Sequence, residues 1–211
     1  MKALILVDIQ NDFLPTGTLP VPHGDEVVAA ANRYMPGFEV VVASQDWHPA
    51  NHGSFAANHA GKKPGEMIEL GGLPQVLWPV HCVQGTRGAE FAPGLDVSRV
   101  THVTRKGMDY GIDSYSAFFD NGHKRATDLH AYLQSRGVKQ VAIMGLATDY
   151  CVKFTALDAR QLGYDVNLIL EGCRGVELKL GDVDSAVDEM RAAGVVVFGE
   201  MVAGRVQRMR S

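Results

Sequence analysis

The feature that most constrains the fold is a series of short apolar segments that alternate with helical patterns. The expected strands are residues 3–7, 39–44, 98–104, 141–144, 165–170 and 195–198. The expected helices are residues 25–34, 127–136, 152–163 and 182–193. This alternation predicts an α/β fold in three layers: a doubly wound, mainly parallel six-stranded sheet with helices on both faces.

Composition and charge narrow the class of protein. The chain has 211 residues, 46% hydrophobic and 21% charged, which fits a single globular domain with a sizeable core. Its formal net charge of -4 gives no reason to expect nucleic acid or an anionic membrane as a partner. Three cysteines indicate a reducing compartment rather than a disulfide scaffold. Because the N-terminal apolar run is too short for a secretion signal, we expect a cytoplasmic protein.

One long region, at about residues 45–99, lacks a clear period and is rich in glycine, proline, asparagine and histidine. The pattern predicts no particular helix or strand there. An irregular connection of this length inside a compact domain is usually functional. We therefore expect this region to contribute binding residues.

Polar residues stand at the carboxyl ends of the predicted strands. Asp8 follows the first strand, Asp46 the second, Lys106 the third and Cys151 the fourth. In a parallel sheet the binding crevice lies beyond the carboxyl ends of the strands. These four residues are therefore expected to meet at one rim of the sheet.

Cys151 lies where a strand turns into a helix. With Thr148 or Asp149 as the cap, Cys151 falls in the first turn, where free N–H groups and the helix dipole favour a thiolate. A lone cysteine is more often a small buried residue. Together with Asp8 and Lys106, however, it could act as a nucleophile. The carboxylate would then move the thiol proton, and the ammonium would favour the ionised sulfur.

A second group of residues has the side chains of a metal site. Asp46, His48 and His81 supply a carboxylate and two imidazoles, which suit Zn, Fe(II) or Mn with positions left for water or substrate. An Asp-x-His pair by itself is a weak signal, because it is more often part of a turn. His52 and Ser54 are close in sequence and are candidates for an extra ligand or for partners of the ligands.

Six blocks of the chain resemble the nicotinamidases, or pyrazinamidases, of the isochorismatase-like cysteine hydrolases. The blocks are LVDIQNDF at 6–13, SQDWHPANHGSF at 44–55, LWPVHCVQGTRGAEF at 77–91, RKGMDYGIDSYSAF at 105–118, MGLATDYCVKFTALDA at 144–159 and GCRGV at 172–176. They span most of the chain in the order of that family. The resemblance implies one isochorismatase-like domain over residues 1–211. Its implied activity is hydrolysis of nicotinamide to nicotinate and ammonia in NAD salvage, with pyrazinamide as a further substrate.

The resemblance also implies roles for individual residues. Three match the catalytic triad of the family: Asp8, Lys106 and Cys151. Three match the protein ligands of one divalent metal ion, with zinc expected ahead of iron or manganese: Asp46, His48 and His81. Three fall where the family lines its ring pocket: Phe13, Trp78 and Tyr115.

The backbone next to the nucleophile has an implied role as well. The Leu146–Ala147 bond matches a cis peptide that turns the amides of Ala147 and Cys151 into an oxyanion hole. Some relatives use a further histidine of the loop after the Asp-x-His pair as a metal ligand. Because loop lengths vary between relatives, we keep His52 outside the ligand set.

Other reactions are compatible with the same fold. Isochorismatases and N-carbamoyl-amine or ureido-acid amidohydrolases are the alternatives, but their reactions do not need a ring nitrogen held on a metal. A non-catalytic binding module would be favoured by a missing triad member, and none is missing from the sequence. A homo-oligomer is compatible with the sequence. The tail with Arg205, Arg208 and Arg210 is expected to be a solvated terminus.

Overall fold

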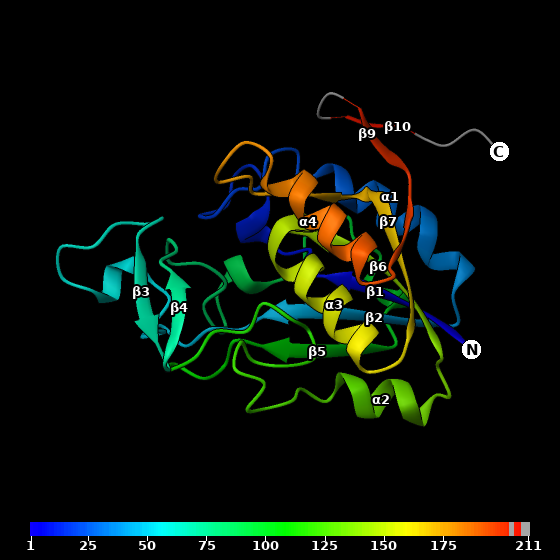
Figure 1. Ribbon diagram of the computed structural model, residues 1–211, viewed down its shortest axis with the longest axis horizontal. Helices are drawn as coiled ribbons and strands as arrows, with labels where there is room; N and C mark the ends of the chain where they lie inside the picture. The colour runs from blue at the N-terminus through cyan, green and yellow to red at the C-terminus, as the bar shows by residue number, and fades with distance from the viewer. Residues whose placement is uncertain (203–204, 208–211) are drawn as a thin grey trace.

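The computed structural model describes residues 1–202 and 205–207. Its centre is a six-stranded sheet in the order β5-β2-β1-β6-β7-β8 (Figure 1). The strands are β1 (Lys2–Val7), β2 (Val40–Asp46), β5 (His102–Lys106), β6 (Gln140–Leu146), β7 (Asp165–Arg174) and β8 (Val196–Phe198). Every neighbouring pair is parallel, so the prediction of a mainly parallel sheet is confirmed.

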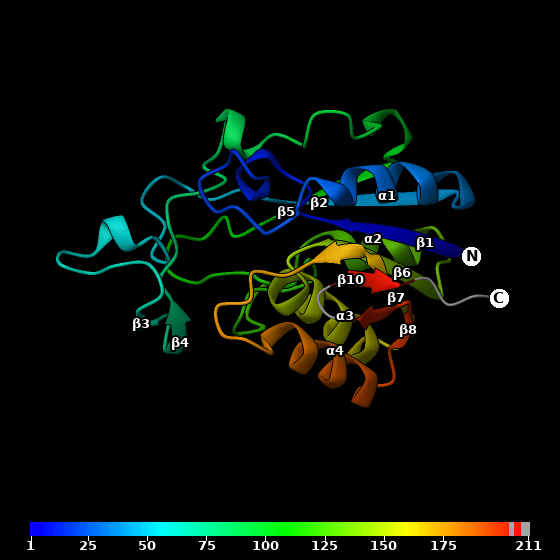
Figure 2. The ribbon, with the colours of Figure 1, turned by 90° about the horizontal axis from the view of Figure 1, so that it is seen from above.

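Helices cover both faces of the sheet, as the alternating pattern predicted. The α-helices are α1 (Glu26–Tyr34), α2 (Leu129–Ser135), α3 (Lys153–Gln161) and α4 (Asp182–Ala192). Figure 2 shows α1 on one side of the sheet and α3 and α4 on the other. The predicted apolar stripe of α4 is buried, because residues three or four positions apart share one face of a helix: Val183, Ala186, Val187 and Met190.

The core lies on the two faces of the central strands. Residues 3–7 of β1 are each at most 1% exposed, and every residue of β2 is buried. Strands covered on both faces are expected to be continuously apolar, which is why the sequence revealed them. The strand predicted at 98–104 begins later, because Val97–Arg99 form a 3-10 turn before β5 starts at His102.

The strand order creates a crevice at the carboxyl edge of the sheet. From β1 the chain moves outward to β2 and β5 on one side, and it then returns to β6, β7 and β8 on the other. The connections after β1 and β6 therefore leave the sheet in opposite directions. Ligands of open α/β sheets bind at such a switch point.

The region at 45–99, for which the sequence predicted no element, contains a hairpin. Strands β3 (Met67–Leu70) and β4 (Leu73–Val76) are antiparallel and project from the sheet at its carboxyl end (Figure 1). Gly71 and Gly72 form the turn with φ of 61° and 86°. Two positive φ values are typical of the tight hairpin turns that glycine favours. The Gly-Gly pair was therefore a signal that the sequence reasoning missed.

Short helical turns complete the described structure. The 3-10 turns are Asn11–Phe13, Met35–Gly37, Ala56–Asn58, Arg87–Ala89 and Val97–Arg99. A hairpin of β9 (Glu200–Val202) and β10 (Arg205–Gln207) follows β8. Arg208 and Arg210 of the basic tail, and the side chain of Arg205, lie outside the described part. Among the described residues, no helix has the length and apolar character needed to cross a membrane.

Candidate active site

The four polar residues that were expected at the rim do lie together there. Asp8 follows β1 directly, and Cys151 lies in the turn after β6. Asp46 and Lys106 are the last residues of β2 and β5 and are paired with each other in the ladder. The sequence had placed both just beyond their strands, because a charged residue reads as the start of a loop. In the structure the Asp46 and Lys106 side chains form an ion pair with each other, which compensates both charges.

The ammonium group of Lys106 is the centre of this cluster. Its Nζ lies 2.9 Å from Asp8 Oδ2, 2.5 Å from Asp46 Oδ1 and 3.3 Å from Cys151 Sγ, and it donates to the Ser114 carbonyl oxygen at 2.9 Å. The Lys106 side chain is 0% exposed. A buried charge of this kind is tolerated only where opposite charges and hydrogen bonds surround it.

The two carboxylates differ in their affinity for a proton. Burial favours the protonated form of Asp46, but the charges of Lys106 and His48 hold the pKa of Asp46 well below its usual value. For Asp8, burial is the largest effect and raises the pKa, although Lys106 opposes it. Burial alone would lower the pKa of Lys106, but Asp46 and Asp8 raise it well above its usual range. Asp8 is therefore the better proton acceptor of the two carboxylates.

Cys151 is a buried thiol that needs a base. Burial raises its pKa well above the usual value, Lys106 opposes this, and the carboxylates of Asp8 and Asp46 reinforce it. The expectation of a thiolate favoured by the helix start is therefore wrong, because desolvation outweighs the attraction of Lys106. One ligand atom from each of Asp8, Asp46 and Cys151 lies within 4.8 Å of the others. A hydrogen bond between the Asp8 carboxyl and the thiol is a further cause of the raised pKa of Cys151, so Asp8 is in position to exchange a proton with the sulfur.

The turn that carries Cys151 differs from the predicted helix start. The Leu146–Ala147 peptide bond is cis, in agreement with the resemblance. Residues Thr148–Val152 form a π-helical turn, and α3 begins only at Lys153. This turn runs directly into α3, so Cys151 lies in the first turn of the continuous helical segment, as predicted, but that turn is π-helical.

The predicted cap residues have other positions. Thr148 and Asp149 lie inside the π-helical turn. The Asp149 carboxylate accepts hydrogen bonds from the backbone N–H groups of Val176 at 2.9 Å and Glu177 at 2.8 Å, in the loop after β7. The assignment of Asp149 as a helix cap was wrong, because a local pattern does not reveal a partner 27 residues away.

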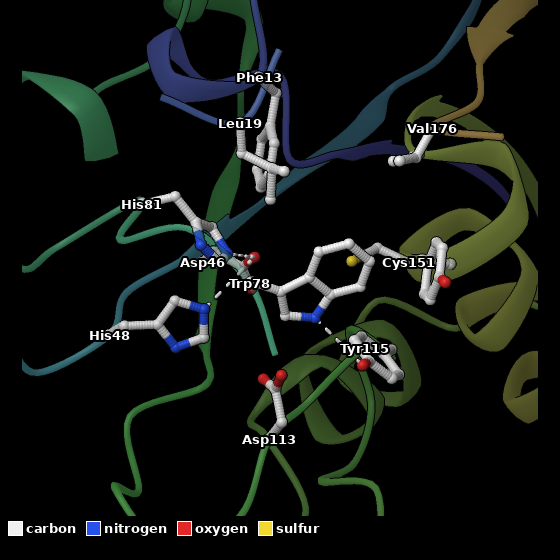
Figure 3. A pocket seen from close by; sticks show the side chains of 12 residues that line it. Phe13, Leu19, Asp46, His48, Trp78, His81, Asp113, Tyr115, Cys151 and Val176 are labelled. Atoms are coloured by element: carbon white, nitrogen blue, oxygen red, sulfur yellow. Dashed lines mark hydrogen bonds and ion pairs between the residues drawn. The ribbon is translucent and has the colours of Figure 1, made fainter. Parts of the chain in front are cut away.

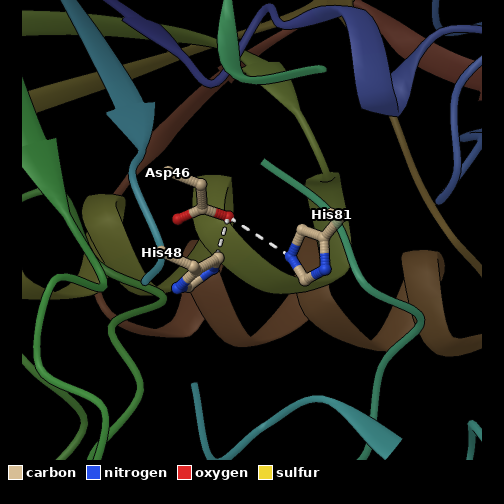
Figure 4. A group of neighbouring side chains, drawn as sticks. All are labelled: Asp46, His48 and His81. Atoms are coloured by element: carbon tan, nitrogen blue, oxygen red, sulfur yellow. Dashed lines mark ion pairs between the residues drawn. The ribbon is translucent and has the colours of Figure 1, made fainter. Parts of the chain in front are cut away.

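The predicted metal ligands form a compact group (Figure 4). His48 Nε2 lies 3.6 Å and His81 Nε2 3.8 Å from Asp46 Oδ2. The Nδ1 atoms of His48 and His81 lie 2.8 Å from the carbonyl oxygens of Gly107 and Pro79. Because a carbonyl oxygen only accepts, each Nδ1 carries a proton and each Nε2 faces Asp46. Burial lowers the pKa of His48, but the Asp46 carboxylate outweighs burial and raises it, so the His48 ring pairs with Asp46 when no ion is bound. Once deprotonated at Nε2, two imidazoles beside one carboxylate oxygen fit a divalent metal ion.

His52 and Ser54 are buried next to this group and are bonded to each other. The Ser54 N–H donates to His52 Nδ1 at 3.2 Å, and the Ser54 hydroxyl lies 2.7 Å from the same nitrogen. Burial and the neighbouring His48 lower the pKa of His52 to about 4, so the ring is neutral at pH 7. Since Nδ1 accepts a hydrogen bond, the proton lies on Nε2. His48, His52 and Asp113 also have ligand atoms within 4.8 Å of one another, so the exclusion of His52 from the ligand set stays a prediction.

Cys151 and the metal-ligand group open into one cavity (Figure 3). The three residues expected around a ring, Phe13, Trp78 and Tyr115, line this cavity. The Tyr115 hydroxyl accepts hydrogen bonds from Trp78 Nε1 at 3.2 Å and from the Gln75 amide at 3.0 Å. These bonds fix the orientation of two aromatic walls beside the sulfur.

Comparison with known proteins assigns the family. Residues 2–200 match the model of the isochorismatase domain. The chain belongs to the isochorismatase family. Among its relatives is the nicotinamidase of Escherichia coli (strain K12), which is 51% identical over 201 residues, 93% of this chain and 94% of the relative.

Solved structures of similar proteins share this fold. A nicotinamidase and pyrazinamidase from Acinetobacter baumanii is 47% identical with a TM-score of 0.90, over 93% of this chain and 94% of that chain. A pyrazinamidase of Pyrococcus horikoshii in complex with zinc is 39% identical with a TM-score of 0.75, over 93% and 97%. An N-carbamoylsarcosine amidase from Thermoplasma acidophilum is 22% identical with a TM-score of 0.68, over 93% and 94%, which shows a shared fold alone.

Four residues of this isochorismatase-family cavity were not predicted: Leu19, Asp113, Tyr150 and Val176. Leu19 and Val176 are apolar and lie far from Cys151 in sequence, so no chemical pattern marks them. Tyr150 could have been found, because it directly precedes the nucleophile in the turn. Asp113 comes from the loop after β5, and its Oδ2 accepts a hydrogen bond from the Gln75 amide at 3.0 Å.

Proposed function

We propose that this protein is a nicotinamidase that hydrolyses nicotinamide to nicotinate and ammonia through a thioester on Cys151. One observation carries the proposal: a buried cysteine with a carboxylate and an ammonium beside it opens into the same cavity as a carboxylate–diimidazole group. Amide hydrolysis by a thiol needs the cysteine, the carboxylate and the ammonium. The carboxylate–diimidazole group would serve to orient a pyridine ring. Pyrazinamide, which carries the same carboxamide on a similar ring, is proposed as a further substrate.

The acylation step uses Asp8, Cys151 and the backbone of the turn. Asp8 takes the thiol proton, and the sulfur forms a bond to the carboxamide carbon. We propose that the oxyanion is bound by the amides of Ala147 and Cys151, where a single donor is typically worth about 3–4 kcal/mol. Protonated Asp8 then gives its proton to the departing nitrogen, and ammonia leaves as the C–N bond breaks.

The same groups hydrolyse the thioester, with Asp8 now acting as the base for a water molecule. Asp8, again a carboxylate, accepts a proton from water, and the resulting hydroxide attacks the acyl carbon. The C–S bond breaks, and the sulfur recovers the proton from Asp8. Lys106 keeps its charge throughout, so it stabilises each state in which Asp8 or Cys151 is ionised.

The ring is proposed to lie against Phe13, Trp78 and Tyr115. A flat aromatic substrate suits walls of this kind, because offset and edge contacts between rings are favourable. Asp46, His48 and His81 would hold one divalent metal ion, for which we propose zinc because a similar solved structure contains it. When bound, the ion supplies an open coordination position for the ring nitrogen, which orients the carboxamide.

We further propose that residues 1–211 act as one catalytic domain in NAD salvage in the cytoplasm. Buried free thiols at Cys82, Cys151 and Cys173 support a reducing compartment. The proposed binding partner is the substrate nicotinamide. We propose no nucleic acid or membrane as a partner. A homo-oligomer is compatible with the sequence.

The decisive experiment is an ammonia-release assay on the purified, zinc-loaded protein with nicotinamide, in which we expect stoichiometric nicotinate. The control is the same protein with C151A. An N-carbamoyl amine and a ureido acid are assayed in parallel. Turnover of either of these without turnover of nicotinamide would move the protein to the neighbouring hydrolases, with Cys151 still the nucleophile.

A further inference from the structure

Asp149 is a buried acid in the nucleophile turn that the proposed mechanism does not use. It is 5% exposed and lies two positions before Cys151. Its Oδ1 accepts the Val176 N–H at 2.9 Å, and its Oδ2 accepts the Glu177 N–H at 2.8 Å. Hydrogen bonds to an ionised acceptor are among the stronger ones in proteins. Asp149 therefore connects the turn of the nucleophile to a distant loop.

That loop forms one wall of the cavity. It runs from the end of β7 to the start of α4, and Val176 in it lines the cavity on the side of Cys151 (Figure 3). Farther along the loop the side chains turn outward, since Leu178 is 47% and Leu180 100% exposed. The wall residue therefore belongs to a segment that has little packing beyond it.

The backbone of the loop is shaped to meet the carboxylate. The successive N–H groups of Val176 and Glu177 both point at Asp149, and the chain then turns at Glu177, whose φ is 54°. Gly175 approaches closely: a Cβ there would lie 2.2 Å from Val183 Cγ2 and 3.1 Å from Asp149 Oδ1. The loop is thus held between α4 and the nucleophile turn, with Asp149 as its polar attachment.

We propose that Asp149 is a positioning residue for the substrate ring. By holding the two amides, it sets the distance between the Val176 wall and the sulfur of Cys151, and so how tightly a flat ring is held. This inference rests on the proposed nicotinamidase function, because the occupant of the cavity is taken to be a pyridine carboxamide. Asp149 acts through Val176 and touches no reacting atom.

The test is D149N in the zinc-loaded protein. An asparagine keeps one acceptor but turns an NH2 group toward the second N–H, so the loop loses part of its attachment. We expect kcat/KM for nicotinamide to fall about 10-fold to 100-fold, mainly through a higher KM. V176A should cost less in the D149N background than in wild type, because the wall has already moved.

A matched control lies at the far end of the same loop, where Asp182 is the first residue of α4. Asp182 Oδ2 accepts the Lys179 N–H at 2.9 Å, so it holds the far end of the loop in the same chemical manner. D182N should leave KM within about twofold of wild type. Trypsin cleavage after Lys179 gives a readout independent of activity, and it should be faster in both variants. If wild type released no ammonia from nicotinamide, the proposed function would fail, while the cleavage rates would still test the attachment.

Other results would overturn the proposal. A D149N protein with unchanged KM and a reduced kcat would show that Asp149 acts on the nucleophile turn alone. Additive effects of D149N and V176A, or equal increases in KM for D149N and D182N, would contradict a role through the Val176 wall. If D149N does not fold, D149S is measured against the same outcomes, since its hydroxyl accepts one of the two amides.

Discussion

Replacement of Lys106 by Met tests the electrostatic account of the site. Methionine has a similar length but no charge, so K106M leaves the buried Asp8 carboxylate facing Asp46 without its cation. Asp46 keeps His48 and His81 as partners, at 3.6 Å and 3.8 Å. Asp8 keeps the Ser44 hydroxyl, which donates to it at 2.7 Å. The uncompensated group in K106M is therefore Asp8.

The size of the effect follows from the proton that Asp8 would bind. An uncompensated buried carboxyl becomes protonated, and neutralising a group with a usual pKa of 3.8 at pH 7 costs about 4 kcal/mol, at about 1.4 kcal/mol per pH unit. This agrees with the loss of about 3–5 kcal/mol typical of a broken buried pair. Because the pKa of Asp8 is already raised in the wild-type protein, part of this cost is present there, and we expect K106M to lose up to about this much unfolding free energy at pH 7.

The loss has a predicted pH dependence. An acid whose pKa is raised in the folded state destabilises the protein increasingly as pH rises above its unfolded pKa. The difference between K106M and wild type should therefore shrink to about 2 kcal/mol at pH 5, because the proton is bound there at lower cost. The measurement is urea unfolding of metal-free protein at both pH values, with a constant m-value as the check on the two-state assumption.

Two further variants complete this test. In K153M the lost pair is partly exposed, since the Lys153 and Glu189 side chains are 18% and 53% exposed, so the loss should stay within about 1 kcal/mol. The double variant K106M/D8N should recover stability at pH 7 while staying inactive, because a neutral amide needs no cation. A loss below about 1 kcal/mol for K106M, or a loss independent of pH, would refute the reasoning.

The remaining predictions concern the nucleophile, the metal and the ring. C151A should lose ammonia release and keep its fold, whereas C173A should stay active, and the reverse result would contradict the nucleophile assignment. D46A and H81A should each lower the metal content per chain, measured by emission spectrometry, and full occupancy in both would reject these ligands. Benzamide, which lacks the ring nitrogen, should have a kcat/KM lower than that of nicotinamide by about 10²–10⁴, and equal values would remove the orienting role of that nitrogen.

The sequence predicted the elements whose apolar residues recur at strand or helix spacing. It did not predict features that depend on contacts between segments far apart in the chain. The apolar run of β1 revealed a strand covered on both faces, and Asp8 and Cys151 then followed from their places at strand ends. Asp149 was misread as a cap because its partners, Val176 and Glu177, come from a loop that pairs with it only in the folded chain. The roles of the triad came from the resemblance, which residue patterns alone would have left open.

The pKa of Cys151 shows a different limit. A cysteine near a helix start suggests a stabilised thiolate, but the sequence does not reveal that the sulfur is buried beside two carboxylates. Desolvation and like charges reverse the expected direction. Likewise, Val176 carries no chemical signature, and its place in the cavity depends on the path of the chain after β7.

The position of β1 in the sheet has a consequence for the order in which the site forms during synthesis. β1 pairs with β6 from Lys2↔Gln140 to Val7↔Gly145, so the central ladder joins the start of the chain to a segment made much later. The segments that bear the metal ligands and Lys106 all precede β6 in the chain. A ribosome releases residues from the N-terminus onward, and contacts between remote segments form late in folding. The nucleophile therefore arrives only after β6, the strand that joins the two halves of the sheet, so a nascent chain holds the metal ligands and Lys106 before it holds Cys151.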